Sequence, residues 1–237
     1  LERLTVSRYG LAGLFEPAWD PEVEPDQWAA VADIIAERDP ATIAINTSDL
    51  TAFGDGMTSS QHTAFLAALP ERFHDRIVSG ETLAVRWLET RTPGELALYP
   101  GVVRLAHSII ARALSREAIT PGVTTADDLS WWYREEVSRL GLKVWFHPSV
   151  GIQRAGVDGM LRGDEVIQPG DLVWTDFGLT YLRLNTDTQA LAYVLRPGET
   201  EPPAGLVAGL EATNRVADIL TSNFEVGLPG NVILARS

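Results

Sequence analysis

The sequence contains no cysteine, which removes several kinds of chemistry at once. Without thiols the chain can form no disulfide framework, present no thiolate nucleophile and build no cysteine-ligated zinc or iron–sulfur site. Any metal ion would have to be held by oxygen or imidazole donors. The absence also fits a reducing compartment, and we expect a cytoplasmic protein.

Basic residues and long apolar runs are scarce as well. Nineteen lysines and arginines face 32 acidic residues, which leaves a formal net charge of −13. This charge opposes binding to phosphate backbones and anionic surfaces, so we expect neither nucleic acid nor a membrane as a partner. No apolar run approaches the roughly 18 residues that span a bilayer, and the N-terminus lacks a signal-peptide pattern. These features predict a soluble protein.

Helix and strand patterns alternate over residues 1–85. The stretch "PDQWAAVADIIAERDP" predicts a helix with Asp26 as its N-cap, and "TIAIN" predicts a short buried strand. A second helix and the strand-like "RIVSGE" follow. This order is typical of the C-terminal part of a small α/β domain.

A second unit is expected over residues 86–237. Thr92 and Glu95 have capping-box spacing, with Pro93 at the first helical position, and another helix is expected to begin near Thr124 or Thr125. The stretch "KVWFHPSVGIQR" resembles a strand, and further strands and the helix "AGLVAGLEATNRVADILTSN" follow. Helices followed by antiparallel-looking strands indicate an α+β fold rather than a parallel doubly wound sheet.

The two ends of the sequence suggest a fragment. It begins at Leu1 rather than methionine, and in "GNVILARS" Asn231 has the pattern of an N-cap before the first turn of a helix. Because proteins rarely stop one turn into a helix, we expect the chain to continue beyond Ser237.

Two aspartates occupy positions where half-buried strands would favour apolar side chains. Asp176 shares a strand face with Trp174, and Asp187 shares one with Gln189. If "LTYLRLNT" reverses the chain between them, both carboxylates can point into one cleft, where they repel each other unless a proton or cation intervenes. One or two divalent metal ions would meet that need. Alternatively, both are turn or strand-edge residues satisfied by backbone N–H groups.

The residues around these aspartates resemble the pita-bread metallopeptidases, the family of methionine aminopeptidase, aminopeptidase P, prolidase and creatinase. The resemblance is carried by "QPGDLVWTDFG", followed by a second aspartate in "NTDTQALAYVL". The stretches "WLETRTPGELALY", "ITPGVTTADDLSWWYREEVSRLGL" and "WFHPSVGIQR" resemble the entry helix, the second helix and the strand before the metal site. Residues 1–85 resemble, more loosely, the N-terminal domain of the aminopeptidase P and creatinase branch.

The resemblance implies a pita-bread catalytic domain and a metallopeptidase of the Xaa-Pro aminopeptidase type, acting at the N-terminal end of peptide substrates. It implies that Asp176 is a bidentate ligand of one metal ion and that Asp187 bridges two. Manganese is the first expectation, with cobalt, iron or zinc as alternatives. In this family a hydroxide between the metals attacks the scissile carbonyl. Relatives with an N-terminal domain also imply a homodimer.

The sequence departs from the family pattern in two places. Family members supply a histidine and two glutamates after the second aspartate, yet no histidine follows Asp187. We therefore expect a chain truncated before its last three ligands, or one that is inactive alone. The family histidine shortly before the first metal aspartate is also missing, since that region reads "AGVDGMLRGDEV". Asp158 or Asp164 could replace it, although both lie in glycine-rich turn sequence, and His147 is interpreted as a structural strand-end residue.

Other residues are interpreted as structural. His62, His74 and His107 are expected to be solvated or satisfied. Trp132 falls on the apolar face of its predicted helix, and Trp131 is expected to cover a loop or a dimer contact.

Three functions stay open. The first is the Xaa-Pro type of peptidase. The second is another hydrolase or lyase on the same fold that acts on a small non-peptide substrate, which the missing upstream histidine favours. The third is a catalytically silent peptide-binding module, against which the two retained carboxylates argue.

Overall fold

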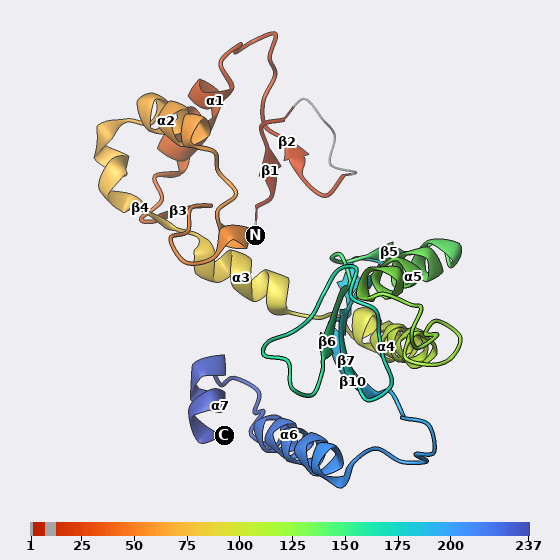
Figure 1. The fold of residues 1–237 in the computed structure, drawn as a ribbon. Helices are drawn as coiled ribbons and strands as arrows, with labels where there is room; N and C mark the ends of the chain where they lie inside the picture. The colour runs from red at the N-terminus through yellow and green to blue at the C-terminus, as the bar shows by residue number, and fades with distance from the viewer. Residues whose placement is uncertain (1, 8–12) are drawn as a thin grey trace. The chain divides into compact units, whose positions relative to one another are not determined.

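The computed structural model describes residues 2–7 and 13–237 and separates into two compact units, Leu1–Arg91 and Thr92–Ser237 (Figure 1). The predicted boundary between residues 85 and 86 falls inside the last helix of the first unit, α3 (Glu81–Glu89). The boundary between the two units in the structure therefore lies after α3 and does not divide this helix.

The first unit combines short strands with helices around a small apolar core. Its elements are β1 (Leu4–Thr5), β2 (Glu16–Pro17), α1 (Gln27–Arg38), β3 (Ile43–Ile45), the 3₁₀ turn η1 (Ala52–Gly54), α2 (Ser59–Ala68), the 3₁₀ turn η2 (Glu71–Arg76), β4 (Ile77–Ser79) and α3. Strands β3 and β4 pair in parallel. The side chain of Asp26 caps α1, as predicted, by accepting from the backbone N–H groups of Trp28 and Ala29.

Two long helices open the second unit, α4 (Pro93–Ala113) and α5 (Ala126–Arg139). Thr92 completes the predicted capping box, and Thr125, one of the two predicted start positions of the second helix, completes another. Pro100 lies inside α4 without ending it. Both helices bury an apolar face, on which Ala106 and Leu129 are completely enclosed.

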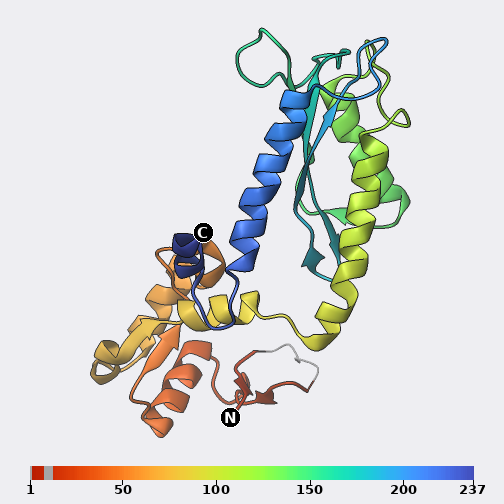
Figure 2. The ribbon, with the colours of Figure 1, turned by 90° about the horizontal axis from the view of Figure 1, so that it is seen from below.

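The strands of the second unit form two antiparallel sheets. They are β5 (Lys143–Val144), β6 (Ser149–Gln153), β7 (Leu172–Phe177), β8 (Leu179–Tyr181), β9 (Leu184–Asn185) and β10 (Thr188–Tyr193). The main sheet has the order β10-β7-β6, and the smaller one has the order β5-β8-β9. Helices α4 and α5 cover one face of the main sheet (Figure 2). Val173, Thr175 and Phe177 point to that face and are fully buried. The α+β class predicted from the sequence is confirmed.

Two details of the second unit differ from the predictions. The stretch "KVWFHPSVGIQR", which was predicted to form one strand, is divided into β5 and β6. These strands pair with β8 and β7 respectively. Pro148 lies between them and has no N–H group to continue a ladder. The final helix α7 (Gly230–Arg236) begins before Asn231, because the carbonyl of Pro229 already accepts from the N–H groups of Val232 and Ile233.

The helix α6 (Ala204–Ser222) precedes α7 and is solvent-exposed along almost its whole length. No helix of the described ranges is both long enough and apolar enough to cross a membrane.

The loop between β6 and β7 is tied at its base by a buried ion pair. Nε and Nη2 of Arg154 donate to the two carboxylate oxygens of Asp171, each over 2.9 Å. The backbone N–H of Gln168 also donates to Asp171, whose side chain is only 2% exposed. This pair holds together the two ends of a loop that reaches the open face of the sheet.

Replacing Asp171 with asparagine should lower the free energy of unfolding by about 2 kcal/mol, because it removes the more buried of the two carboxylates that neutralise the Arg154 guanidinium. Urea unfolding at pH 7 measures the effect. Asp164→Asn, an exposed change in the same loop, is the matched control and should shift stability by less than about 0.5 kcal/mol. Equal unfolding midpoints for the two variants would contradict the prediction.

Candidate functional site

The candidate site lies on the face of the main sheet that α4 and α5 leave uncovered. Successive side chains of a strand point to opposite faces, so Trp174 and Asp176 point away from the buried residues of β7. Ser149 on β6 and Gln189 on β10 are the cross-strand partners of Asp176. Partners in an antiparallel pair project to the same side, so polar side chains flank Asp176 on both neighbouring strands.

A tight hairpin brings the second aspartate back to this face. Strands β8 and β9 are joined by Leu182 and Arg183, whose φ angles of 49° and 66° lie in the left-handed region. Two such residues make a two-residue turn that suits the twist of a hairpin, although bulky side chains rarely adopt it. The predicted chain reversal in "LTYLRLNT" is therefore present.

A close backbone approach sets where the returning chain lies. The N–H of Thr186 donates to the carbonyl of Leu179 over 2.9 Å, and the N–H of Leu179 donates to Oγ1 of Thr186 over 3.1 Å. A Cβ atom on Gly178 would lie 2.2 Å from the carbonyl oxygen of Thr186, so only glycine fits there. Asp187 follows directly and lies just before β10 rather than inside it, which corrects its predicted place in the strand.

The structure brings the two predicted carboxylates together. Burial, then the charge of Asp187 and a hydrogen bond with its carboxyl group, raise the pKa of Asp176 above its ordinary value. Oδ1 of Asp176 is buried and has no hydrogen-bond partner within the described part of the chain. Asp176 is therefore not the turn residue, satisfied by backbone N–H groups, that the alternative interpretation required.

The chemistry of this pair suits a divalent cation. Carboxylate oxygens are the donors that hard and borderline divalent ions prefer, and a cation would satisfy the buried Oδ1 of Asp176 and neutralise the repulsion between the two groups. Among the residues described, no group of three or more histidine, aspartate or glutamate side chains is arranged to hold a metal. The pair fits a metal centre as two donors of a larger set.

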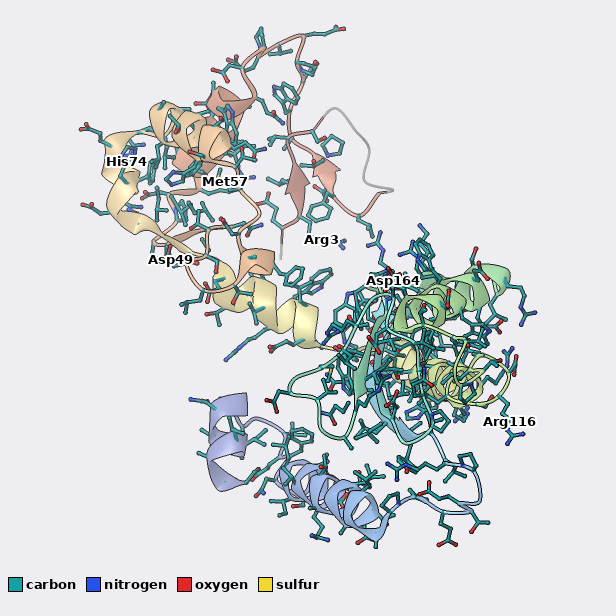
Figure 3. The ribbon with its side chains drawn as sticks, viewed as in Figure 1. Arg3, Asp49, Met57, His74, Arg116 and Asp164 are labelled. Carbon is teal, nitrogen blue, oxygen red and sulfur yellow. The ribbon has the colours of Figure 1, made fainter. Side chains whose placement is uncertain are left out.

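The other candidate residues lie elsewhere. Nδ1 of His147 is 3.1 Å from Nη1 of Arg134, and its ring packs edge-on against the exposed Trp131. Asp158 and Asp164 are exposed in the loop between β6 and β7, where Figure 3 labels Asp164.

The remaining histidines and the second tryptophan have ordinary surroundings. Nε2 of His74 lies 2.9 Å from the carbonyl oxygen of Leu69. His62 is half-buried on α2, and His107 is exposed on α4. Trp132 packs against the core of the second unit, as predicted.

Sequence reasoning missed one charged residue of the open face, Arg162. Its guanidinium carbon lies 5.4 Å from the centre of the Trp174 ring. The available signal was the apolar Leu161 beside it, because a residue next to an inward-pointing side chain projects outward.

The first prediction from this site concerns the close approach at Gly178. Gly178→Ala should lower the free energy of unfolding by about 1–3 kcal/mol, because the new methyl group overlaps the Thr186 carbonyl. Gly205→Ala, where nothing lies within 4 Å of the added atom, is the control and should be neutral or slightly stabilising in its helix. Thermal unfolding of both variants tests this, and equal melting temperatures would contradict it.

The second prediction concerns the pH dependence of the metal-free protein. The folded state raises the pKa of Asp176 above an unfolded value of about 3.9, so the folded state binds that proton more tightly. Stability should therefore fall as pH rises from the unfolded pKa through the folded one. Asp176→Asn removes this loss. In the presence of a chelator, the melting temperature of Asp176→Asn should match that of wild type near pH 3.5 and exceed it at pH 7. A difference that does not change with pH would contradict the raised pKa of Asp176.

Comparison with known proteins gives matches among solved structures. No family model and no curated protein matches this sequence. Similar structures include an X-Pro aminopeptidase from Thermotoga maritima (15% identity, TM-score 0.63) and a Xaa-Pro dipeptidase from Bacillus anthracis (21% identity, TM-score 0.62). A dipeptidase from Pyrococcus horikoshii matches with 16% identity and a TM-score of 0.61.

These matches cover nearly all of this chain but not of the other proteins. They include 94%, 95% and 94% of this chain, and 57%, 58% and 58% of the respective matched chains. The chain therefore spans a little over half the length of these structures. Sequence identities at this level show the fold alone, and that fold is the pita-bread fold that the sequence resemblance implied.

Proposed function

We propose that this chain supplies two carboxylate ligands, Asp176 and Asp187, to a divalent-metal centre in a peptidase of the Xaa-Pro aminopeptidase type. The observation that carries the proposal is the buried Oδ1 of Asp176, which has no hydrogen-bond partner among the described residues and belongs to a carboxyl group held against Asp187. The fold shared with Xaa-Pro peptidases supports the same assignment.

The two carboxylates differ in rigidity and in exposure to solvent. Asp176 lies on β7, which is hydrogen-bonded on both sides, so its position is the more rigid of the two. Asp187 is exposed at the mouth of the hairpin and can reach a second ion or the solvent. Ser149 and Gln189 flank Asp176 and can hydrogen-bond the backbone of an extended peptide on the open face.

A divalent ion bound here would supply Lewis acidity that polarises a substrate carbonyl and activates water. Two carboxylates alone hold a transition metal weakly. The proposal therefore requires further donors, which we assign to the part of the whole protein that corresponds to the unmatched length of the similar structures. Manganese is the first ion to test, because oxygen donors suit it, followed by cobalt, iron and zinc.

A second candidate function is another hydrolytic or lyase reaction on a small non-peptide substrate. The loop between β6 and β7 contains no histidine, so the group that contacts the substrate in the family's peptidases is missing from its expected place. Assaying Xaa-Pro peptides beside small amides and guanidino compounds would separate the two functions.

Asp187→Asn in the full-length protein tests the metal assignment, since it removes a charge at nearly constant volume. Manganese affinity should fall by at least about tenfold, and cleavage of an Xaa-Pro peptide should be lost. The melting temperature of the metal-free protein should not fall, because a like-charge repulsion is removed. Titration calorimetry and peptide cleavage measure these effects.

Asp127→Asn is the matched control, because its carboxylate is exposed on α5, which covers the other face of the main sheet. Metal affinity and activity should both stay at the wild-type level in this variant. Retention of metal and activity in Asp187→Asn would remove Asp187 from the site.

A further inference from the structure

A positively charged side chain, that of Arg162, lies on the same open face of the sheet as the two carboxylates. Leu161, in the loop between β6 and β7, bridges Ile152 of β6 through two backbone hydrogen bonds of 2.9 Å. Leu161 packs against the core of the second unit. Since neighbouring residues of an extended segment point to opposite sides, Met160 and Arg162 project onto the open face.

A glycine makes room for this arrangement. A Cβ atom on Gly151 would lie 2.1 Å from Sδ of Met160, so Met160 occupies the space that a side chain would otherwise fill. Nη2 of Arg162 lies 3.3 Å from the same sulfur atom, and its guanidinium lies over the ring of Trp174. Sulfur and indole together hold the guanidinium at a defined place.

Trp174 connects that place to the carboxylate pair. It lies on β7 two residues before Asp176 and on the same face, a separation of about 7 Å along the strand. Its Nε1 donates to Oε1 of Gln189 over 3.3 Å, and Gln189 is the cross-strand partner of Asp176. Asp176, Gln189, Trp174 and Arg162 thus form one continuous surface.

Arg162 forms no ion pair with the residues that the structure describes. Its side chain is exposed, and within the described ranges no carboxylate lies at ion-pair distance from it. By contrast, Arg112 and Arg154 of the same unit each bind two carboxylates. An arginine that lies over an aromatic ring keeps the donors at its edge available for a planar anion such as a carboxylate.

We propose that Arg162 is a specificity-determining residue that binds the free C-terminal carboxylate of a short peptide whose amino end lies at Asp176 and Asp187. The proposal rests on the proposed peptidase function. An extended peptide advances about 3.3–3.6 Å per residue, so about 7 Å corresponds to two residues beyond the cleaved bond. A tripeptide matches this spacing, with its terminal carboxylate over Trp174.

The competing explanation is that Arg162 only covers the Trp174 ring. That role predicts a small loss of stability on substitution and no change in the choice between peptides. The binding role predicts a change in selectivity for the terminal carboxylate.

The test compares the tripeptide Ala-Pro-Ala with its C-terminal amide in the full-length, manganese-loaded protein. Wild type should cleave the acid with a kcat/KM about tenfold higher than the amide, as expected for a charge-assisted hydrogen bond. Arg162→Gln should bring this ratio close to one with little change for the amide. Arg162→Lys, which keeps the charge, should retain part of the preference.

Arg116→Gln is the matched control. Arg116 is an exposed residue of the loop that follows α4 (Figure 3), so this variant has the same charge change away from the open face. It should keep the wild-type ratio. Melting temperatures of all variants should lie within a few degrees of each other, which separates selectivity from unfolding.

A binding measurement keeps this inference separate from the proposed function. In chelator, where cleavage is absent, tryptophan fluorescence titration should show that wild type binds the acid more tightly than the amide and that Arg162→Gln does not. If wild type cleaves neither peptide but the binding difference is present, the peptidase proposal fails and the role of Arg162 stands. A ratio near one in wild type, or an unchanged preference in Arg162→Gln, would overturn the inference.

Discussion

The contact between Gly178 and the backbone of Thr186 is the constraint on which the open face depends. Because no side chain separates these segments, the β8–β9 hairpin can fold back tightly enough to exchange hydrogen bonds between Leu179 and Thr186. That closure places Asp187 beside Asp176. The pKa of Asp176 is raised by its burial and by the neighbouring charge of Asp187, so this backbone requirement contributes to the electrostatic feature that marks the site.

Local patterns predicted much of this molecule. Thr92 and Thr125 cap helices through side chains three residues apart, an interaction that short sequence patterns encode directly. The alternation around Asp176 predicted that it shares a face with Trp174, and two left-handed residues between Tyr181 and Leu184 supply the chain reversal on which the pairing of the carboxylates depended. The α+β class followed from the order of such elements.

Non-local pairing accounts for what the sequence did not reveal. The division between β5 and β6 depends on their different partners, β8 and β7, which lie far along the chain. Arg162 reaches the open face only because Leu161 pairs with Ile152, and because Gly151 leaves space for Met160. To predict any of these positions, the register between two separate segments must be known. The alternation of residues within a single segment does not contain that information.

The position of β10 at the edge of its sheet gives the two carboxylates different local stability. Asp176 is carried by the central strand, whose opening requires loss of ladders to both β6 and β10. Asp187 stands where the hairpin meets an edge strand with one partner, so fraying of that edge displaces it first. The spacing between the two carboxylates would then change with the opening of one edge strand. Amide hydrogen exchange in β10, rather than in β7, would report that motion.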